Sequence, residues 1–462
     1  MTADHNRTGT ARPGNAGDGF PVLRGDVAGI DVGSEVHWVC APAREGEGRD
    51  VASFEATTPG VHALIAWLQE RGVRSAALES TGVYWIVPHE MLEAAGLEAV
   101  LVDTRALRGV PGRPKSDRRD CEWLQRLHAC GLIRGAFRPP EQVCLLRTLM
   151  RDRATLIAER ADWLRRMQKS LDQMNVRVHR AVSDLDGVTG MAILRAIARG
   201  ERDPQRLAAL RDPRCRKSAA EIATQLTGHW RADHLFSLQQ ALHMYDAITE
   251  RIAAYDQEVQ RQLRAMTPED RRDREAPPPT KRAKAKALKA RGQDALRQAL
   301  YRMSGVDLTA IDALGVETVS VILSEYGTDL SCFPSEKQFV AHLRLAPHRP
   351  ISGGKVLTKK KKPGSASARV ALALRMAAVT LRRSQTAFGA YYRRIAQRLG
   401  ADVAVFATAR KLAQHVYRLL RWGHPYVDEG AAAYEQRYQQ ARLTRLATTA
   451  KHLGYDLIAR PA

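Results

Sequence analysis

The sequence predicts an α/β domain near the N-terminus, followed by a long and almost entirely helical remainder. Short apolar runs bounded by turn residues, typical of strands, recur between Val27 and Val102 and stop at about Pro139. Apolar residues then recur every seven positions over two long stretches, which is the spacing of long helices that pack along a seam. The chain has 462 residues, and at roughly 150 residues per domain this is room for about three domains.

The elements of the first domain follow one another in a definite order. Thr58-Pro59 opens the first helix, because Pro fits the first helical position. Three strands followed by alternating helices and strands are the order of a ribonuclease-H-like fold, although other α/β folds begin similarly. The expected elements are strands over 27–32, 36–41 and 50–55, a helix from Thr58 to Gly72, a strand over 76–79, a helix ending at Gly96, a strand over 98–102 and a helix over 116–130.

Two long helices are expected in the middle of the chain. A heptad pattern of apolar residues runs from Val143 to Val178, and a second runs from Leu238 to Met266. An antiparallel coiled coil or an oligomer interface would use such helices, and the core of a monomeric helical hairpin fits them equally well. The stretch between them, residues 187–225, is rich in arginine and has no clear period.

These patterns divide the chain into five expected parts. Residues 1–24 are polar and glycine-rich, as in a disordered leader, and residues 267–292 combine a proline run with many lysines and arginines. That basic stretch is either a nucleic-acid-binding arm or a solvated linker. The parts are a leader (1–24), a ribonuclease-H-like α/β domain (25–138), a helical coiled-coil region with an insertion and the basic linker (139–299), a C-terminal helical domain (300–428) and a helical tail (429–462).

The charge balance indicates a polyanionic partner. Lys and Arg number 72 and Asp and Glu number 50, so the formal net charge is +22. No apolar run reaches the roughly 18–20 residues that a membrane helix needs, and the first residues lack the apolar core of a signal peptide. The six cysteines form no CxxC pair, so neither a disulfide scaffold nor a zinc finger is expected. We expect a cytoplasmic, nucleoid-associated protein.

Four carboxylates are the candidate catalytic residues. Asp31 ends the first expected strand and Glu79 ends the fourth, and in a ribonuclease-H-like sheet these strand ends are neighbours. Asp117 and Asp120, spaced i and i+3, share one face of a helix. Each residue alone could equally be a helix cap. Together they form an oxygen-rich set that suits Mg²⁺ or Mn²⁺, and two such ions can clamp a phosphodiester.

Several segments resemble motifs of one known family. Residues 29–32 (GIDV), 78–85 (LESTGVYW) and 115–120 (KSDRRD) resemble the motifs GID, EATGxYW and KTDxxDA. Residues 312–315 (DALG), 333–347 (FPSEKQFVAHLRLAP), 352–353 (SG) and 361–364 (KKPG) resemble a PGIG-type turn, FxSxxxFxAxxGLxP, a serine-glycine turn and a basic loop. The sequence is therefore similar to the DEDD transposases of the IS-one-ten family of bacterial insertion sequences.

The resemblance implies a recombinase with a composite site. A RuvC-like domain would bind Mg²⁺ (or Mn²⁺) through Asp31, Glu79, Asp117 and Asp120, and Ser352 would attack a DNA phosphate to form a covalent link. A noncoding bridge RNA would select the DNA sites, and the protein would form a homo-oligomer, a dimer or tetramer in which the two domains of one site come from different subunits. Nucleic-acid contacts are expected from Gly315, Gly353, Lys355, Lys359, Lys360, Lys361, Lys362 and Arg369.

The sequence departs from the family pattern at a few positions and leaves other functions open. Ala313 replaces the first glycine of the PGIG-type turn, and Asp103-Thr104 replaces an Asn-Pro pair. Without the resemblance, Ser352 and the glycines after it would be an ordinary turn. A RuvC-like endonuclease that uses water as the nucleophile, or a nucleic-acid-binding protein that has lost catalysis, would also fit the carboxylates and the charge.

Overall fold

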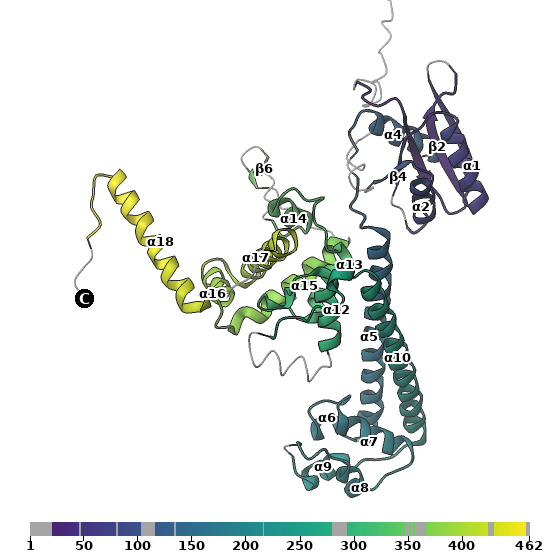
Figure 1. The fold of residues 1–462 in the computed structure, drawn as a ribbon. Coiled ribbons are helices and arrows are strands. Elements are labelled where there is room, and N and C mark those ends of the chain that lie inside the picture. The colour runs from purple at the N-terminus through teal and green to yellow at the C-terminus, as the bar shows by residue number, and fades with distance from the viewer. Residues whose placement is uncertain are drawn as a thin grey trace, which may run out of the picture. The chain divides into compact units, whose positions relative to one another are not determined.

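The structure of the protein is a computed structural model (Figure 1). It describes residues 21–45, 48–79, 82–102, 116–133, 135–215, 217–279, 293–346, 351–352, 355–356, 366–423 and 429–458. The chain divides into two compact units, Met1–Arg138 and Pro139–Ala462. Among the described helices, none has both the length and the hydropathy that crossing a membrane requires.

The first unit is built on a five-stranded mixed sheet. Its spatial order is β3-β2-β1-β4-β5. The hairpin strand β2 is antiparallel to both β1 and β3, and β4 is parallel to β1 and to β5. The α/β prediction for this part of the chain is confirmed. The strands are β1 (Val27–Val32), β2 (Val36–Pro42), β3 (Arg49–Glu55), β4 (Ser75–Glu79) and β5 (Glu98–Val102).

Helices cover both faces of this sheet. α1 (Thr58–Gln69) and α2 (Ile86–Ala94) pack against one face, where alternate strand residues such as Ile30 and Leu78 are fully buried. The cap of α1 is Thr57, one residue earlier than expected, and its side chain accepts a hydrogen bond from Gly60 N at 3.2 Å. α4 (Asp117–Ala129) covers the other face.

The second unit contains a long antiparallel pair of helices, α5 (Glu141–Gln173) and α10 (Ala232–Ala265). Two contacts along the pair give the direction: Arg153 bonds to Asp256 at 2.5 Å, and Arg160 lies over the ring of Tyr245. The predicted seam is largely buried, but α5 ends at Gln173, so Val178 belongs to the short helix α6 (Val178–Ala181). A regular coiled coil stays a prediction. Buried seam residues are Val143, Leu146, Met150, Met167, Leu171, Leu238, Tyr245, Ile252 and Val259.

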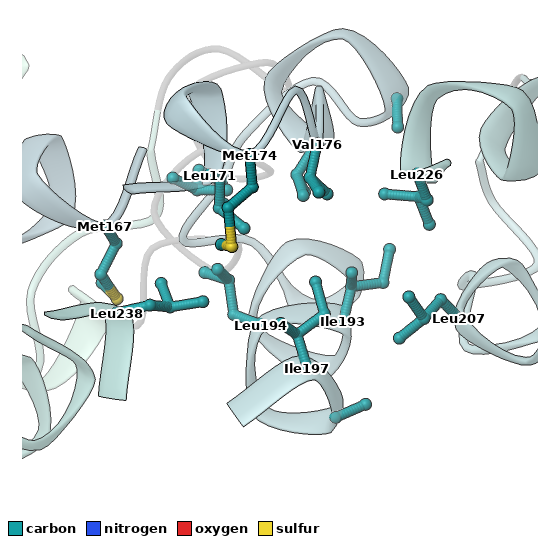
Figure 2. Close-up of a cluster of buried hydrophobic side chains, with 14 of the residues drawn as sticks. Met167, Leu171, Met174, Val176, Ile193, Leu194, Ile197, Leu207, Leu226 and Leu238 are labelled. Carbon is teal, nitrogen blue, oxygen red and sulfur yellow. The ribbon is translucent and has the colours of Figure 1, made fainter. Parts of the chain in front are cut away.

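A small helical module, the tip module (residues 178–226), closes the far end of this hairpin. The sequence showed no period in most of this stretch. α7 (Val188–Ala198), α8 (Pro204–Ala209) and α9 (Ala219–Leu226) follow α6, and α9 begins with a capping box between Ser218 and Glu221. Figure 2 shows side chains from all three helices meeting those of the hairpin ends in one apolar cluster. The cluster includes Met167, Met174, Ile193, Leu194, Leu207, Leu226 and Leu238.

The rest of the second unit is helical apart from one short hairpin. Its elements are α12 (Asp294–Ser304), α13 (Val316–Tyr326), α14 (Glu336–His342), β6 (Ile351–Ser352), β7 (Lys355–Val356), α15 (Ala366–Thr380), α16 (Ala387–Leu399), α17 (Ala401–Trp422) and α18 (Gly430–His452), with 3₁₀ turns η1 (Glu269–Arg271), η2 (Leu308–Ala310) and η3 (Leu381–Arg383). The prediction of a mainly helical remainder is confirmed. Tyr326, Phe333, Phe339 and Tyr417 stack edge-on or tilted at its centre.

Residues at the end of the expected leader and within the expected basic linker make hydrogen bonds. Leu23 N and Arg24 N, at the end of the expected leader, donate to Ala129 O at 2.8 and 3.0 Å. In the Pro-rich stretch, Arg297 of α12 donates to Pro277 O at 2.6 Å. Residues 1–20 and 280–292 lie outside the described residues.

The turn before α13 has a left-handed residue that is not glycine. Ala313 has φ of 67°, a conformation that costs an L-residue about 1–2 kcal/mol. Gly adopts this conformation without strain but loses more entropy on folding. We expect Ala313→Gly to raise the free energy of unfolding by about 0.5–1 kcal/mol, measured by urea denaturation. Ala310→Gly, at a position without positive φ, is the control and should not stabilise; equal stabilisation by both changes would contradict the account.

Candidate active site

Two of the candidate carboxylates lie at the carboxyl ends of adjacent parallel strands. β1 and β4 pair in register, with Ile30 opposite Leu78. Asp31 and Glu79 are the next residues along these two strands, and both remain within the sheet through pairs with Trp38 and Val102 respectively. Both side chains are partly exposed. The register thus sets Asp31 and Glu79 side by side at one edge.

These two carboxylates also share a face of the sheet. Side chains alternate along a strand, so Asp31 points to the same face as Gly29, and Glu79 to the same face as Ala77. Gly29 lies directly beneath α4, and Ala77 packs in a cluster with Leu124 of that helix. Asp31 and Glu79 therefore both point to the face that α4 covers.

The direction of α4 brings its first turn to this same edge. Its middle crosses β1 at Gly29, and further along the helix Gln125 donates to Val27 O at 3.3 Å. Near its end, His128 Nε2 and Ser75 Oγ are 2.8 Å apart, at the beginning of β4. α4 thus runs antiparallel to β1 and β4, and its N-terminus lies at their carboxyl ends.

Asp117 and Asp120 occupy the first turn of α4. Ser116 caps the helix, and its side chain accepts a hydrogen bond from Arg119 N at 3.4 Å. Acidic side chains are favourable here because they oppose the positive end of the helix dipole. Asp117 is exposed and Asp120 is partly buried. The first turn of α4, which carries Asp117 and Asp120, therefore lies at the same edge of the sheet as Asp31 and Glu79.

Negative charge at this edge affects the pKa of a cysteine in α4. Burial raises the pKa of the Cys121 thiol to about 12, and nearby negative charge, including that of Asp31, adds to the effect. Asp31 thus acts on the second turn of α4 across the interface. Cys121 stays a neutral thiol at physiological pH and adds no charge to the site.

The donor set fits a hard divalent cation. Four carboxylates offer only oxygen ligands, which is the chemistry that Mg²⁺ and Mn²⁺ prefer. Among the described residues, no three His, Cys, Asp or Glu side chains lie close enough together to hold a metal ion. The two segments that flank the edge, residues 80–81 and 103–115, lie outside the described residues.

The close approach of α4 depends on Gly29, which the sequence analysis did not single out. A Cβ at this position would lie 2.2 Å from Gln125 N and 2.4 Å from Cys121 O, both backbone atoms that cannot rotate away. A glycine inside a buried strand is the sequence signal for such an approach. The hydrogen bonds of Gln125 and His128 were missed as well, because no motif marks them.

We expect Gly29→Ala to push α4 away from β1 and to destabilise the first unit by about 1–3 kcal/mol, the usual cost of overpacking. Urea denaturation followed by circular dichroism would measure it. Gly25→Ala is the control, since nothing lies within 4 Å of a Cβ there. Equal stability of the two variants would show that α4 does not rest on Gly29.

The candidate serine lies in the second unit, on a two-stranded hairpin. Ser352 ends β6 and pairs with Lys355, the first residue of β7. Gly315 is the N-cap residue of α13, and Arg369 is an exposed residue near the start of α15. Gly353 and Lys359, Lys360, Lys361 and Lys362 lie outside the described residues. The predicted nucleic-acid contacts thus fall on two regions of the second unit.

Two known families match parts of this chain. Residues 28–176, which include all of the sheet except its first residue, and α4, match a DEDD-type transposase family named for IS110. Residues 306–393, which include the Ser352 hairpin, match the family described as "Transposase IS116/IS110/IS902 family". No curated protein matches the chain.

The two matches fall in the two segments whose motifs carried the resemblance. The residues outside the matches are 1–27, then 177–305, with the tip module and α10, and 394–462, with the end of α16, α17 and α18. The chain belongs to the IS110 family of transposases.

Proposed function

We propose that the protein recombines the DNA of its own insertion sequence through a covalent Ser352–DNA intermediate. The observation that carries the proposal is that Asp31, Glu79 and the first turn of α4, which carries Asp117 and Asp120, lie at one edge of the sheet. Four acids in such a place repel one another unless a cation lies among them. A net charge of +22 supports a nucleic-acid substrate.

In this proposal the four carboxylates hold Mg²⁺ or Mn²⁺. The bound cation would supply charge neutralisation at the phosphodiester and lower the pKa of an attacking hydroxyl. Asp31 and Glu79 are fixed by strand register, whereas Asp117 and Asp120 are fixed by the packing of α4. The two pairs are thus positioned by separate elements that meet at Gly29.

The proposed chemistry of Ser352 is transesterification. The Ser352 oxygen attacks phosphorus, one P–O bond of the DNA backbone breaks, and the departing DNA oxygen takes up a proton as the serine hydroxyl loses one. Attack by a hydroxyl of another strand reverses these changes and releases the serine. One ester bond forms for each that breaks, so the exchange needs no external energy source or redox partner.

The remaining parts of the proposal concern partners. A noncoding bridge RNA would pair with donor and target DNA, so that the protein reads mainly backbone and shape. The carboxylates belong to the first unit and Ser352 to the second, and a homo-oligomer would combine them from different subunits. The α5–α10 hairpin offers a long surface for such assembly, for example as a coiled coil.

Denaturing gel electrophoresis tests the serine step. The protein would be expressed together with the flanking DNA of its element and treated with Mg²⁺, beside Ser352→Ala and the control Ser237→Ala, an exposed serine of α10. We expect a protein–DNA adduct in the wild type and in the control, and none in Ser352→Ala.

Two other outcomes would contradict the proposal in different ways. Metal-dependent cleavage that leaves a free 5′-phosphate and no adduct would identify a hydrolytic RuvC-like nuclease. Salt-sensitive nucleic-acid binding with neither cleavage nor adduct in any sample would identify a binding protein that has lost catalysis. An adduct that persists in Ser352→Ala would show that another residue is the nucleophile.

A further inference from the structure

An arginine-lined groove runs between α16 and α18, outside the candidate active site. It encloses about 850 Å³ and is open to solvent along its length. Three of its arginines come from α16 and two from α18: Arg393, Arg394, Arg398, Arg442 and Arg445. Apart from Arg393, all of these lie beyond the segments that match the transposase families.

The positive charge of this groove is largely uncompensated. Glu435 is the single carboxylate that lines it, and none of the five arginines forms an ion pair with any residue in the described part of the chain. Neighbouring arginines behave differently, since Arg437 pairs with Glu429 and Arg418 pairs with Glu336. Five guanidinium groups around one groove repel each other, and a bound anion would relieve that repulsion.

Aromatic stacking holds one wall of the groove in place. The guanidinium carbon of Arg394 lies 3.8 Å from the ring centroid of Tyr438 and 5.1 Å from that of Tyr434. None of the residues of α18 is buried, and these stacks, together with an edge contact between Tyr391 and Tyr434, contribute to its attachment to α16.

Four residues of α18 that line the groove lie on one side of the helix. Tyr434, Tyr438, Arg442 and Arg445 follow at spacings of four, four and three, which places them on one side of a helix. The two tyrosines anchor the helix, and the two arginines extend along the same side beyond the anchor. Both are exposed. The guanidinium groups of Arg398, Arg442 and Arg445 are thus left for a ligand.

We propose that the groove between α16 and α18 binds the phosphodiester backbone of a nucleic acid. Guanidinium groups match phosphate oxygens through paired hydrogen bonds, and a row of them along an open groove suits a chain of phosphates better than a single anion. The groove goes beyond the proposed recombination chemistry, because it needs neither the carboxylates nor Ser352. DNA and RNA present the same backbone, and the test separates them.

Binding measured without metal tests this inference on the full chain. Fluorescence anisotropy in EDTA would compare the wild type with Arg442→Ala/Arg445→Ala, using a labelled DNA duplex and a labelled single-stranded RNA over a range of salt. The matched control is Arg251→Ala/Arg264→Ala, which removes two exposed arginines from α10. We expect the groove variant to bind one of the two probes about tenfold more weakly at 0.1 M salt.

The salt dependence gives a second readout. The slope of the logarithm of the binding constant against the logarithm of the salt concentration is negative. Removing two phosphate contacts should make it shallower by about 1.8 for the duplex, or about 1.4 for the single strand. Arg442→Lys/Arg445→Lys should restore most of the slope, since it keeps both charges. The probe that loses affinity identifies the bound nucleic acid as DNA or RNA.

Unchanged affinity and slope for both probes in the groove variant would overturn the proposal, as would equal losses in the α10 control. Circular dichroism checks that the variant is folded; because both side chains are exposed, we expect no change. These results are independent of the serine adduct, so a groove that binds nucleic acid and a protein that fails to cleave DNA can be told apart.

Discussion

Asp31→Asn and Asp120→Asn are each expected to lower DNA cleavage by about a thousandfold while leaving the fold intact. Each replacement keeps the size of the side chain and removes one negative charge from the edge where β1, β4 and the first turn of α4 meet. Electrostatic groups aimed at a reacting centre are worth about 10²–10³ or more in rate. Cleavage of element-end DNA in Mg²⁺ or Mn²⁺, followed by gel electrophoresis, would measure the loss.

A control on the same helix separates catalysis from stability. Glu122 of α4 pairs with Arg118 of its own helix at 3.3 Å, so Glu122→Gln should cleave at close to the wild-type rate. DNA binding by Asp31→Asn should be equal to that of the wild type or tighter, because a repulsive charge has gone. Cleavage at the wild-type rate by Asp31→Asn would show that this edge takes no part in the reaction.

The second large effect is expected at a buried ion cluster between α13 and α5. Glu325 is 2% exposed and accepts two hydrogen bonds from Arg151, at 2.9 and 2.7 Å. Arg147, 15% exposed, lies 3.1 Å from the same carboxylate and also donates to the backbone oxygen of Glu325. Burial lowers the pKa of the Arg147 guanidinium, and the negative charge of the Glu325 carboxylate opposes this shift.

Glu325→Gln is expected to lower the free energy of unfolding of the second unit by about 3–5 kcal/mol. The variant leaves the buried cation of Arg147 without its counter-charge, which is the costly way to break a buried pair. Urea denaturation of the full chain, followed by the helical signal, would measure the shift.

The same two helices provide the control for this prediction. Glu317, also on α13, is 54% exposed and lies 3.6 Å from Arg153 of α5. Glu317→Gln should cost at most about 1 kcal/mol, as is usual for exposed pairs. A small effect of Glu325→Gln, comparable to that of Glu317→Gln, would mean that α13 does not depend on this cluster for its place on α5.

The sheet and the edge with Asp31 and Glu79 were predictable because their signals are local. Each strand is a short apolar run between turn residues, and Asp31 and Glu79 could be placed at strand ends by position alone. The direction of α4 across the sheet could not be predicted from local sequence. It follows from the contact at Gly29 and from the bonds of Gln125 and His128 with strands far away in sequence.

The tip module could not be predicted because its core is shared among many short elements. α8 and α9 each contribute only two or three buried residues, too few to show a period, and the cluster is completed by Met174 and Leu238 from the hairpin ends. Ser352 is a different case. Its Ser-Gly-Gly context is compatible with any tight turn, and only the family resemblance singled it out.

Mass spectrometry of the protein–DNA adduct tests the central claim most directly. The wild type, Asp31→Asn and Ser352→Ala would each be incubated with element-end DNA and Mg²⁺, digested with nuclease and protease, and searched for peptides that carry a nucleotide. We predict a nucleotide on Ser352 in the wild type alone. A nucleotide on any other residue, or cleaved DNA without a modified peptide, would contradict the proposed joint action of the carboxylates and the serine.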